Sequence, residues 1–155
     1  MRVRVTNNEK ENTMSNETLA HATVVNTKPA FSSAGIIWLK LASLYLVLGI
    51  VIGIAMGASE NFTLRPVHAH VNLLGWTTLA LSGLIYSLFP LAAQSRLAKL
   101  HFWLLNLALP VMMVTLTLLL FGHKEVIPVM ALAEIAAALA VLAFVINMFK
   151  NLKAG

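Results

Sequence analysis

Uncharged stretches long enough to cross a bilayer alternate with short charged segments along this chain. The charge-free runs lie at 41–59, 66–95, 100–123 and 126–149, and only Glu134 interrupts the last one. A transmembrane helix needs roughly 20 mostly apolar residues, whereas a membrane strand needs about 10. The pattern therefore predicts an all-α fold, a bundle of four transmembrane helices at about 36–58, 67–90, 98–121 and 126–149.

The composition removes the other broad classes of protein. Of 155 residues, 59% are hydrophobic and 11% are charged, and the mean hydropathy is +0.81. Because soluble domains average about 25% charged residues, we exclude a soluble globule, a disordered chain and a nucleic-acid partner. The chain has no cysteine, which excludes disulfides, iron–sulfur clusters and thiolate zinc sites.

Polar and basic residues mark the ends of the membrane domain. Residues 1–34 have no apolar face and are expected to form a flexible tail before a four-helix domain at 35–150, with a C-terminal tail at 151–155. Lys and Arg gather in the tails and in the loop between helices two and three, while Arg65 and Lys124 lie on the other side. Since cytoplasmic loops are rich in Lys and Arg, we expect both termini in the cytoplasm. The expected location is the lipid bilayer of a bacterial inner (cytoplasmic) membrane, as a multi-pass protein.

This topology gathers three histidines near the outer face. His68 and His70 begin the second helix and His123 ends the third, whereas His101 begins the third helix at the inner side. Neutral imidazole is a common metal ligand, and an ionisable residue inside a membrane is a functional candidate. For each of them, ligation competes with an ordinary role as a cap or a headgroup contact.

The spacing of the first two histidines favours two sites rather than one. At about 100° per residue, positions two apart in a helix point about 200° away from each other. His68 and His70 therefore cannot easily chelate a single metal from a regular helix. Asn72 and Gly75 share the face of His68, and Gly75 would let a flat group approach the backbone closely.

Two short runs resemble a known family. In chain order they are Arg65-Pro66-Val67-His68-Ala69-His70-Val71-Asn72-Leu73-Leu74-Gly75-Trp76 and Leu100-His101-Phe102-Trp103-Leu104-Leu105-Asn106. The first resembles the second helix of subunit I of haem–copper oxidases and nitric oxide reductases, and the second resembles the third helix of that subunit. In the family, the histidine matching His68 is an axial ligand of the low-spin haem, and the position matching His101 is not a ligand.

The resemblance implies how one arc of that subunit could act. Family subunit I has about twelve helices in three arcs of four, and its tenth helix carries a His-x-His pair that ligates two different haems. His68-Ala69-His70 is similar to that pair. A homotrimer of this chain would mimic the twelve-helix subunit, with a haem between His68 of one protomer and His70 of its neighbour.

The form of haem and its contacts follow from the same resemblance. The chain has no Cys-x-x-Cys-His site, so haem b is expected, and two histidine ligands would make it low-spin. Arg65 is expected to pair with the haem propionates. An alternative within one protomer pairs His68 or His70 with His123.

The expected function is electron transfer through a bis-His haem b, with respiratory-chain carriers as partners, or haem-based sensing of a redox or gaseous signal. The resemblance argues against an enzyme, because the copper site and most helices of a haem–copper reductase are missing. The rival hypothesis is a copper- or zinc-binding accessory or assembly protein for a respiratory oxidase, which would use His68, His70 and His123 without haem. A third hypothesis is a purely structural helix bundle.

Three further features concern helix contacts and polar side chains within the spans. Gly49, Gly53 and Gly57 form a stripe on the first helix that permits close contact, either within the protomer or between protomers. Glu134 lies about two turns into the fourth helix. It is expected to be a partner of a histidine ring, a proton relay, or a neutral acid bonded to Thr115, Thr117 or a backbone carbonyl. Tyr86 is expected to anchor the second helix at the inner interface.

Overall fold

The computed structural model describes residues 32–152, and every regular element in this range is helical. In chain order the elements are α2 (Ser33–Ser59), α3 (Arg65–His70), η1 (Val71–Thr78), α4 (Leu79–Leu88), α5 (Pro90–Ala93), α6 (Arg96–Leu120), η2 (Lys124–Val126) and α7 (Ile127–Asn151). Four helical segments, at 33–59, 65–88, 96–120 and 124–151, are long and apolar enough to cross a membrane. The predicted all-α class is confirmed for these residues, and four helices of sufficient length and hydropathy lie where four spans were predicted, which supports a multi-pass membrane protein.

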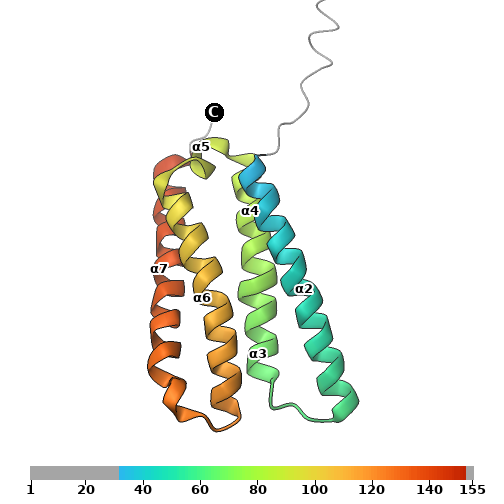
Figure 1. Ribbon diagram of the computed structural model, residues 1–155. Coiled ribbons are helices and arrows are strands. Elements are labelled where there is room, and N and C mark those ends of the chain that lie inside the picture. The colour runs from blue at the N-terminus through green and yellow to red at the C-terminus, as the bar shows by residue number, and fades with distance from the viewer. Residues whose placement is uncertain (1–31, 153–155) are drawn as a thin grey trace, which may run out of the picture. The chain divides into compact units, whose positions relative to one another are not determined.

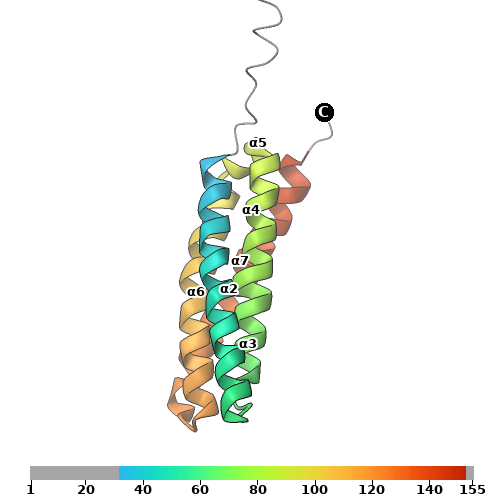
Figure 2. The same cartoon turned by 90° about the vertical axis from the view of Figure 1, so that its right-hand side faces the viewer.

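The four spans form two helical hairpins (Figure 1). In the first hairpin α2 packs along α4 and η1, and in the second α6 packs along α7. The hairpins meet where α3 and η1 touch α6, and α5 bridges to α6 and α7 at one end. We call this the α5 end, and we call the opposite end, which carries the loops at 60–64 and 121–126, the η2 end. Figure 2 shows α2 in front of α6 on one side, with α4 in front of α7 on the other.

Helix boundaries depart from the predicted ones by up to three residues at the start and two at the end. The second span ends at Leu88 rather than 90, because Phe89, before Pro90, leaves the helical conformation (φ −123°, ψ 79°). The first span begins at Ser33, so residues 33 and 34 of the predicted tail belong to α2, and Asn151 of the predicted C-terminal tail belongs to α7. The predicted tail residues 1–31 and 153–155 lie outside the described residues, as does His21.

Two serines set where spans begin. The side chain of Ser32 accepts a hydrogen bond from the Gly35 backbone N–H at 3.1 Å, and Ser95 does the same for Ala98 at 3.0 Å. Such caps satisfy N–H groups that a helix start leaves free. The capped starts of α2 and α6 lie at the same end of the bundle, opposite the histidine pair.

The outer surface of the spans is apolar. Leu44, Ile54, Leu107, Leu132 and many other large aliphatic residues are exposed along all four spans. A helix that is hydrophobic all round belongs in a large core or in a membrane. The exposed aliphatic faces therefore fit burial in lipid.

Candidate functional site

His68 faces α2, and the glycines of that helix make room for it. Its ring Nδ1 lies 3.0 Å from the carbonyl oxygen of Gly49, and a Cβ on Gly53 would stand 3.0 Å from the ring carbon Cε1. The Asn72 side chain donates to the backbone oxygen of His68 at 2.8 Å and fills the space over Gly49. Gly49 and Gly53 thus serve packing within the protomer, while a Cβ on Gly57 would meet nothing within 4 Å.

His70 lies on the other side of the same helix, as the spacing predicts. Its Nδ1 is 2.8 Å from the carbonyl oxygen of Pro66, and the residue is exposed. It borders a groove of about 300 Å³ between η1, α6 and α7, together with Leu74, Met112 and Glu134. An ionisable ring therefore faces outward within a membrane-spanning segment.

The two carbonyl contacts define the state of both rings. A carbonyl oxygen only accepts hydrogen bonds, so Nδ1 carries the hydrogen in each neutral imidazole. Nε2 then keeps its lone pair in His68 and in His70. A ring held by an Nδ1–H bond to a backbone carbonyl, with Nε2 left as donor atom, is the usual arrangement of a metal-ligating histidine.

Glu134 is placed differently from the interpretation that bonds it to a threonine. Its side chain is exposed in the groove beside His70, while Thr115 and Thr117 bond to carbonyl oxygens of their own helix, those of Val111 and Met113, at 2.8 Å. Within residues 32–152 the Glu134 carboxylate has no hydrogen-bond partner. The acid and the imidazole thus share one outward-facing groove.

Gly75, which the sequence places among the expected cofactor contacts, lies against Tyr45. A Cβ at this position would stand 2.6 Å from Cγ and Cδ1 of Tyr45. The flat group that approaches Gly75 is therefore the ring of Tyr45 in α2, and this face of the helix is already filled. Asn72 likewise holds the backbone and ring of His68, rather than standing open.

Arg65 and His123 both lie at the η2 end, next to or within its loops. The Arg65 guanidinium stands 5.4 Å from the centre of the Phe62 ring, a cation–π distance. His123 follows α6 in the loop, where its Nδ1 lies 2.9 Å from the Glu125 carboxylate. In the range 32–152 no three His, Asp or Glu side chains come close enough to hold a metal ion. The described structure therefore does not bring His68, His70 and His123 together.

The histidine pair is followed directly by a π-helical segment that the pattern of apolar residues did not predict. Residues Val71–Thr78 are wound with i→i+5 hydrogen bonds, and the hydroxyls of Thr77 and Thr78 donate to the carbonyl oxygens of Asn72 and Leu73 at 3.0 and 2.8 Å. π-helical turns are rare and occur frequently at functional sites. Consecutive threonines after a glycine are the signal in the sequence that could have pointed to it.

A second polar cluster, also missed, lies at the α5 end. Tyr86 is fully buried, so the expected role as an interface anchor is wrong. Its hydroxyl lies 3.1 Å from Nδ1 of His101 and accepts from the Asn147 side chain at 3.4 Å. The ring of His101 lies 4.6 Å from that of Trp38, centre to centre. All four spans contribute a side chain to this cluster.

His101 holds one unpartnered atom in this cluster. The contact of Tyr86 with Nδ1 and the bond that it accepts from Asn147 account for Nδ1 and the phenol oxygen, which leaves Nε2 of the imidazole ring. Nε2 is buried and has no hydrogen-bond partner among the described residues. In an antiparallel bundle, Tyr86, His101 and Asn147 fall at a similar distance from the same end of their helices. This is the signal in the sequence that could have predicted their contact.

No family model, curated protein or solved structure matches the chain. The likeness to subunit I of haem–copper oxidases accordingly rests on two short motifs, and the functional argument rests on the side chains described above.

Proposed function

We propose that the protein binds haem b through His68 and His70 as a bis-His, low-spin site, and uses it for electron transfer or redox sensing. One observation carries the proposal. Both rings are held by Nδ1 contacts to backbone carbonyls, at 3.0 Å for His68 and 2.8 Å for His70, which makes Nε2 of each ring the proposed ligand atom. Nε2 of His68 stands 3.5 Å from the Asn72 amide nitrogen, so ligation requires that amide to turn aside. Haem iron with two nitrogen ligands supplies one-electron chemistry.

The residues fit a haem in their donor chemistry and in their exposure. His70 is exposed, and His68 is partly buried against α2. Arg65, at the first position of α3, is exposed and can pair with a carboxylate such as a propionate. Because Gly75 is covered by Tyr45, it takes no part in the proposed site.

The exposed position of His70 supports ligation between protomers. A polar ring that faces outward in a membrane is costly unless it finds a partner. Since His68 and His70 lie on opposite sides of one helix, a head-to-tail ring of three copies would pair His68 of one protomer with His70 of the next. Such heterologous contacts form closed rings when the rotation closes. The proposed assembly is a homotrimer in a bacterial inner membrane, with both termini in the cytoplasm.

Electron transfer fits this site better than catalysis. Two histidine ligands leave the iron no open position, which suits electron transfer rather than ligand activation. Respiratory electron carriers are the corresponding class of partner. The chain's own residues hold the two rings in place through the carbonyl groups of Gly49 and Pro66.

Absorbance spectroscopy of the purified protein tests the proposal. We would express the chain with haem supply, purify it in mild detergent and record oxidised and reduced spectra with a pyridine haemochrome assay. We expect a low-spin b-type spectrum at about one haem per chain. His68→Ala and His70→Ala should each abolish it, while His123→Ala, the matched control, should leave it unchanged. Colourless protein would overturn the proposal, and colourless protein with bound copper or zinc would favour the accessory-protein hypothesis.

Mixing two inactive variants distinguishes ligation between protomers from ligation within one. In a head-to-tail ring, a His68→Ala protomer beside a His70→Ala protomer has one interface with both ligands intact. Co-expression should therefore restore a low-spin spectrum that neither variant shows alone. Loss of the spectrum in His123→Ala, with retention in His70→Ala, would instead support the pairing of His68 with His123. A monomeric mass for the haem-loaded protein would rule out the trimer.

A further inference from the structure

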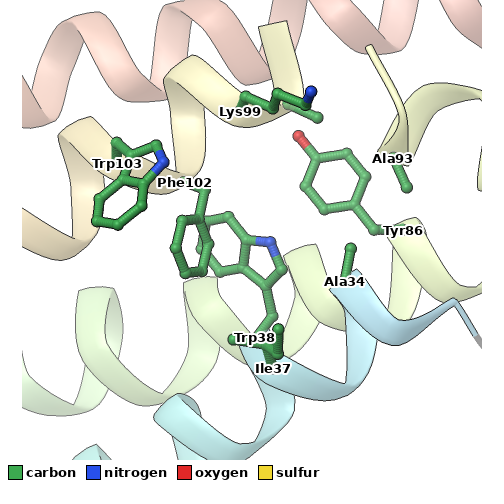
Figure 3. Close-up of a pocket in the computed structure, with 9 residues that line it drawn as sticks. Ala34, Ile37, Trp38, Tyr86, Ala93, Lys99, Phe102 and Trp103 are labelled. Atoms are coloured by element: carbon green, nitrogen blue, oxygen red, sulfur yellow. The ribbon is translucent and has the colours of Figure 1, made fainter. Parts of the chain in front are cut away.

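The first and third spans leave a groove between them at the α5 end. It has a volume of about 210 Å³ and lies between the start of α2 and the start of α6 (Figure 3). Trp38, Tyr86 and Ala93 are buried and form its floor, while Phe102 and Trp103 stand along α6 and Lys99 lies at its edge. The groove is distinct from the histidine pair, which lies towards the η2 end.

The groove combines an aromatic lining with one cation. Trp103 is 62% exposed, and Lys99 is exposed as well. Figure 3 shows Lys99 at the edge of the labelled side chains and the Trp38 indole nitrogen on the side of Tyr86. A cavity walled by aromatic rings also suits a quaternary ammonium group, but the Lys99 charge disfavours a cation. The hydrogen-bond donors of Trp38 and Lys99 therefore favour a ligand that accepts hydrogen bonds, and the Lys99 charge favours an anion.

The whole α5 end has an unbalanced charge. Lys40, Arg96, Lys99 and Lys150 lie within about two turns of this end, and no described Asp or Glu does. At the η2 end, Arg65 and Lys124 are offset by Glu60 and Glu125. The first turn of α6 contains no acidic residue, although a helix start favours negative charge. An anion from outside the chain would complement both features.

The apolar surface continues from this groove along the same two helices. α2 and α6 do not pack closely against each other. Further along they border a second hollow of about 280 Å³, lined by apolar side chains such as Leu48, Ile52, Met113 and Val114. Exposed aliphatic residues lie along both helices. An acyl chain can lie along this face, with its headgroup at the α5 end.

We propose that the groove at the α5 end binds an anionic phospholipid, with the headgroup phosphate at Lys99 and an acyl chain against Phe102 and Trp103. Trp rings at the membrane interface and lysines that reach toward headgroups are the general means by which proteins contact this region. Basic pockets between transmembrane helices bind anionic headgroups. Phosphatidylglycerol is the probe that carries this chemistry.

Tryptophan quenching by brominated lipids tests the site in the full-length protein. The chain has three tryptophans, and Trp76→Phe leaves Trp38 and Trp103, both at the groove. This variant would be reconstituted in phosphatidylcholine vesicles that contain a small fraction of brominated phosphatidylglycerol or brominated phosphatidylcholine. We expect the anionic lipid to quench more strongly at equal fraction. The same titration on the wild-type protein keeps the test valid if Trp76→Phe does not fold.

A charge-matched pair of variants ties the selectivity to the groove. Lys99→Gln should weaken the preference for phosphatidylglycerol by about five-fold, the size expected for one basic contact near a membrane surface. Lys150→Gln removes the same charge at the same end but outside the groove, and should leave the preference unchanged. Equal quenching by both lipids in the wild type, or equal loss in the two variants, would overturn the proposal.

Two further arms identify other occupants. Soluble glycerol phosphate should not reduce the quenching, and competition by it would show a site for a free phosphate rather than for a lipid. Absence of quenching by either lipid would show that the groove is covered by protein, such as a second copy of this chain, and would also overturn the proposal. None of these outcomes depends on haem, so the lipid site and the haem site are tested separately.

Discussion

Single glycines decide how closely the first two spans approach. Gly49 and Gly53 make room for Asn72 and His68, and Gly75 makes room for the Tyr45 ring. The missing Cβ atoms allow helix contacts of the kind that small residues provide in membranes. At this scale, Gly49 and Gly53 pack within the protomer and position a candidate ligand.

Gly75→Ala tests this close packing. Its Cβ would stand 2.6 Å from Cγ and 2.8 Å from Cβ of Tyr45, too near the backbone of α2 for the ring to rotate away. We expect a loss of about 1–3 kcal/mol in the free energy of unfolding, as for other overpacked sites, measured by thermal or denaturant unfolding in detergent with circular dichroism. Gly57→Ala, where a Cβ meets nothing within 4 Å, is the control. An equal effect of the two substitutions would contradict the proposed contact.

The buried polar side chains at the α5 end give a second prediction at the residue scale. Asn147 is fully buried, donates to the Ala92 carbonyl oxygen at 3.0 Å and accepts from Ser95 at 2.7 Å. Asn147→Leu should destabilise the protein by about 1–3 kcal/mol, because it leaves these buried partners unpaired. Asn106→Leu removes only a bond to Phe102 within one helix and should cost less. A smaller loss for Asn147→Leu than for Asn106→Leu would show that the cluster does not stabilise the bundle.

At the scale of the elements, the second span combines three kinds of backbone. It begins as α3, winds as a π-helical segment over Val71–Thr78 and ends as α4. The extra residue of a π turn rotates the side chains of α3 about the helix axis relative to those of α4. The histidine pair therefore points in directions that a continuous α-helix, in register with α4, would not give.

A double substitution tests what holds the π-helical segment. Thr77→Val with Thr78→Val keeps the shape of both side chains and removes the bonds to the carbonyl oxygens of Asn72 and Leu73. We expect faster amide hydrogen exchange in 71–78 and a loss of about 1–3 kcal/mol for two hydrogen bonds. Thr117→Val, which removes an ordinary bond to Met113 within α6, should leave exchange in 71–78 unchanged. Unaltered exchange in the double variant would show that packing alone maintains the π turns.

At the scale of the whole molecule, the four spans leave two lateral grooves between the hairpins. One, bordered by α2 and α6, carries Lys99 and aromatic rings, and the other, bordered by η1 and α7, carries His70 and Glu134. Polar groups exposed inside membrane segments mark functional sites by default. The groove proposed for a lipid lies at the α5 end, whereas the histidine pair proposed for a haem lies towards the η2 end.

The orientation in the membrane can be measured with single cysteines, since the chain has none. Ser59→Cys lies at the η2 end and Gln94→Cys at the α5 end, and both positions are exposed. Because the basic residues gather at the α5 end, that end should face the cytoplasm. A membrane-impermeant maleimide should label Ser59→Cys in intact spheroplasts, and Gln94→Cys only after lysis. The reverse result would invert the predicted topology.

The number of spans and most of their limits follow from the sequence alone. In a bilayer each span must satisfy its own backbone hydrogen bonds, so length and hydropathy suffice to identify the helices. The opposite directions of His68 and His70 are likewise a local property of helix geometry. By contrast, the end of the second span at Leu88 and the short helix α5 were not predicted. The apolar run continues past Leu88, and only the local effect of Pro90 ends the helix there.

The partners of each side chain are decided only by the tertiary structure. Tyr86 meets His101 and Asn147, which lie 15 and 61 residues further along the chain, and Tyr45 covers Gly75. These pairings depend on which faces of the helices pack together and on the rotation introduced by the π-helical segment. Hydropathy is nearly uniform around membrane helices, since lipid is as apolar as leucine, so the sequence pattern carries little information about those faces.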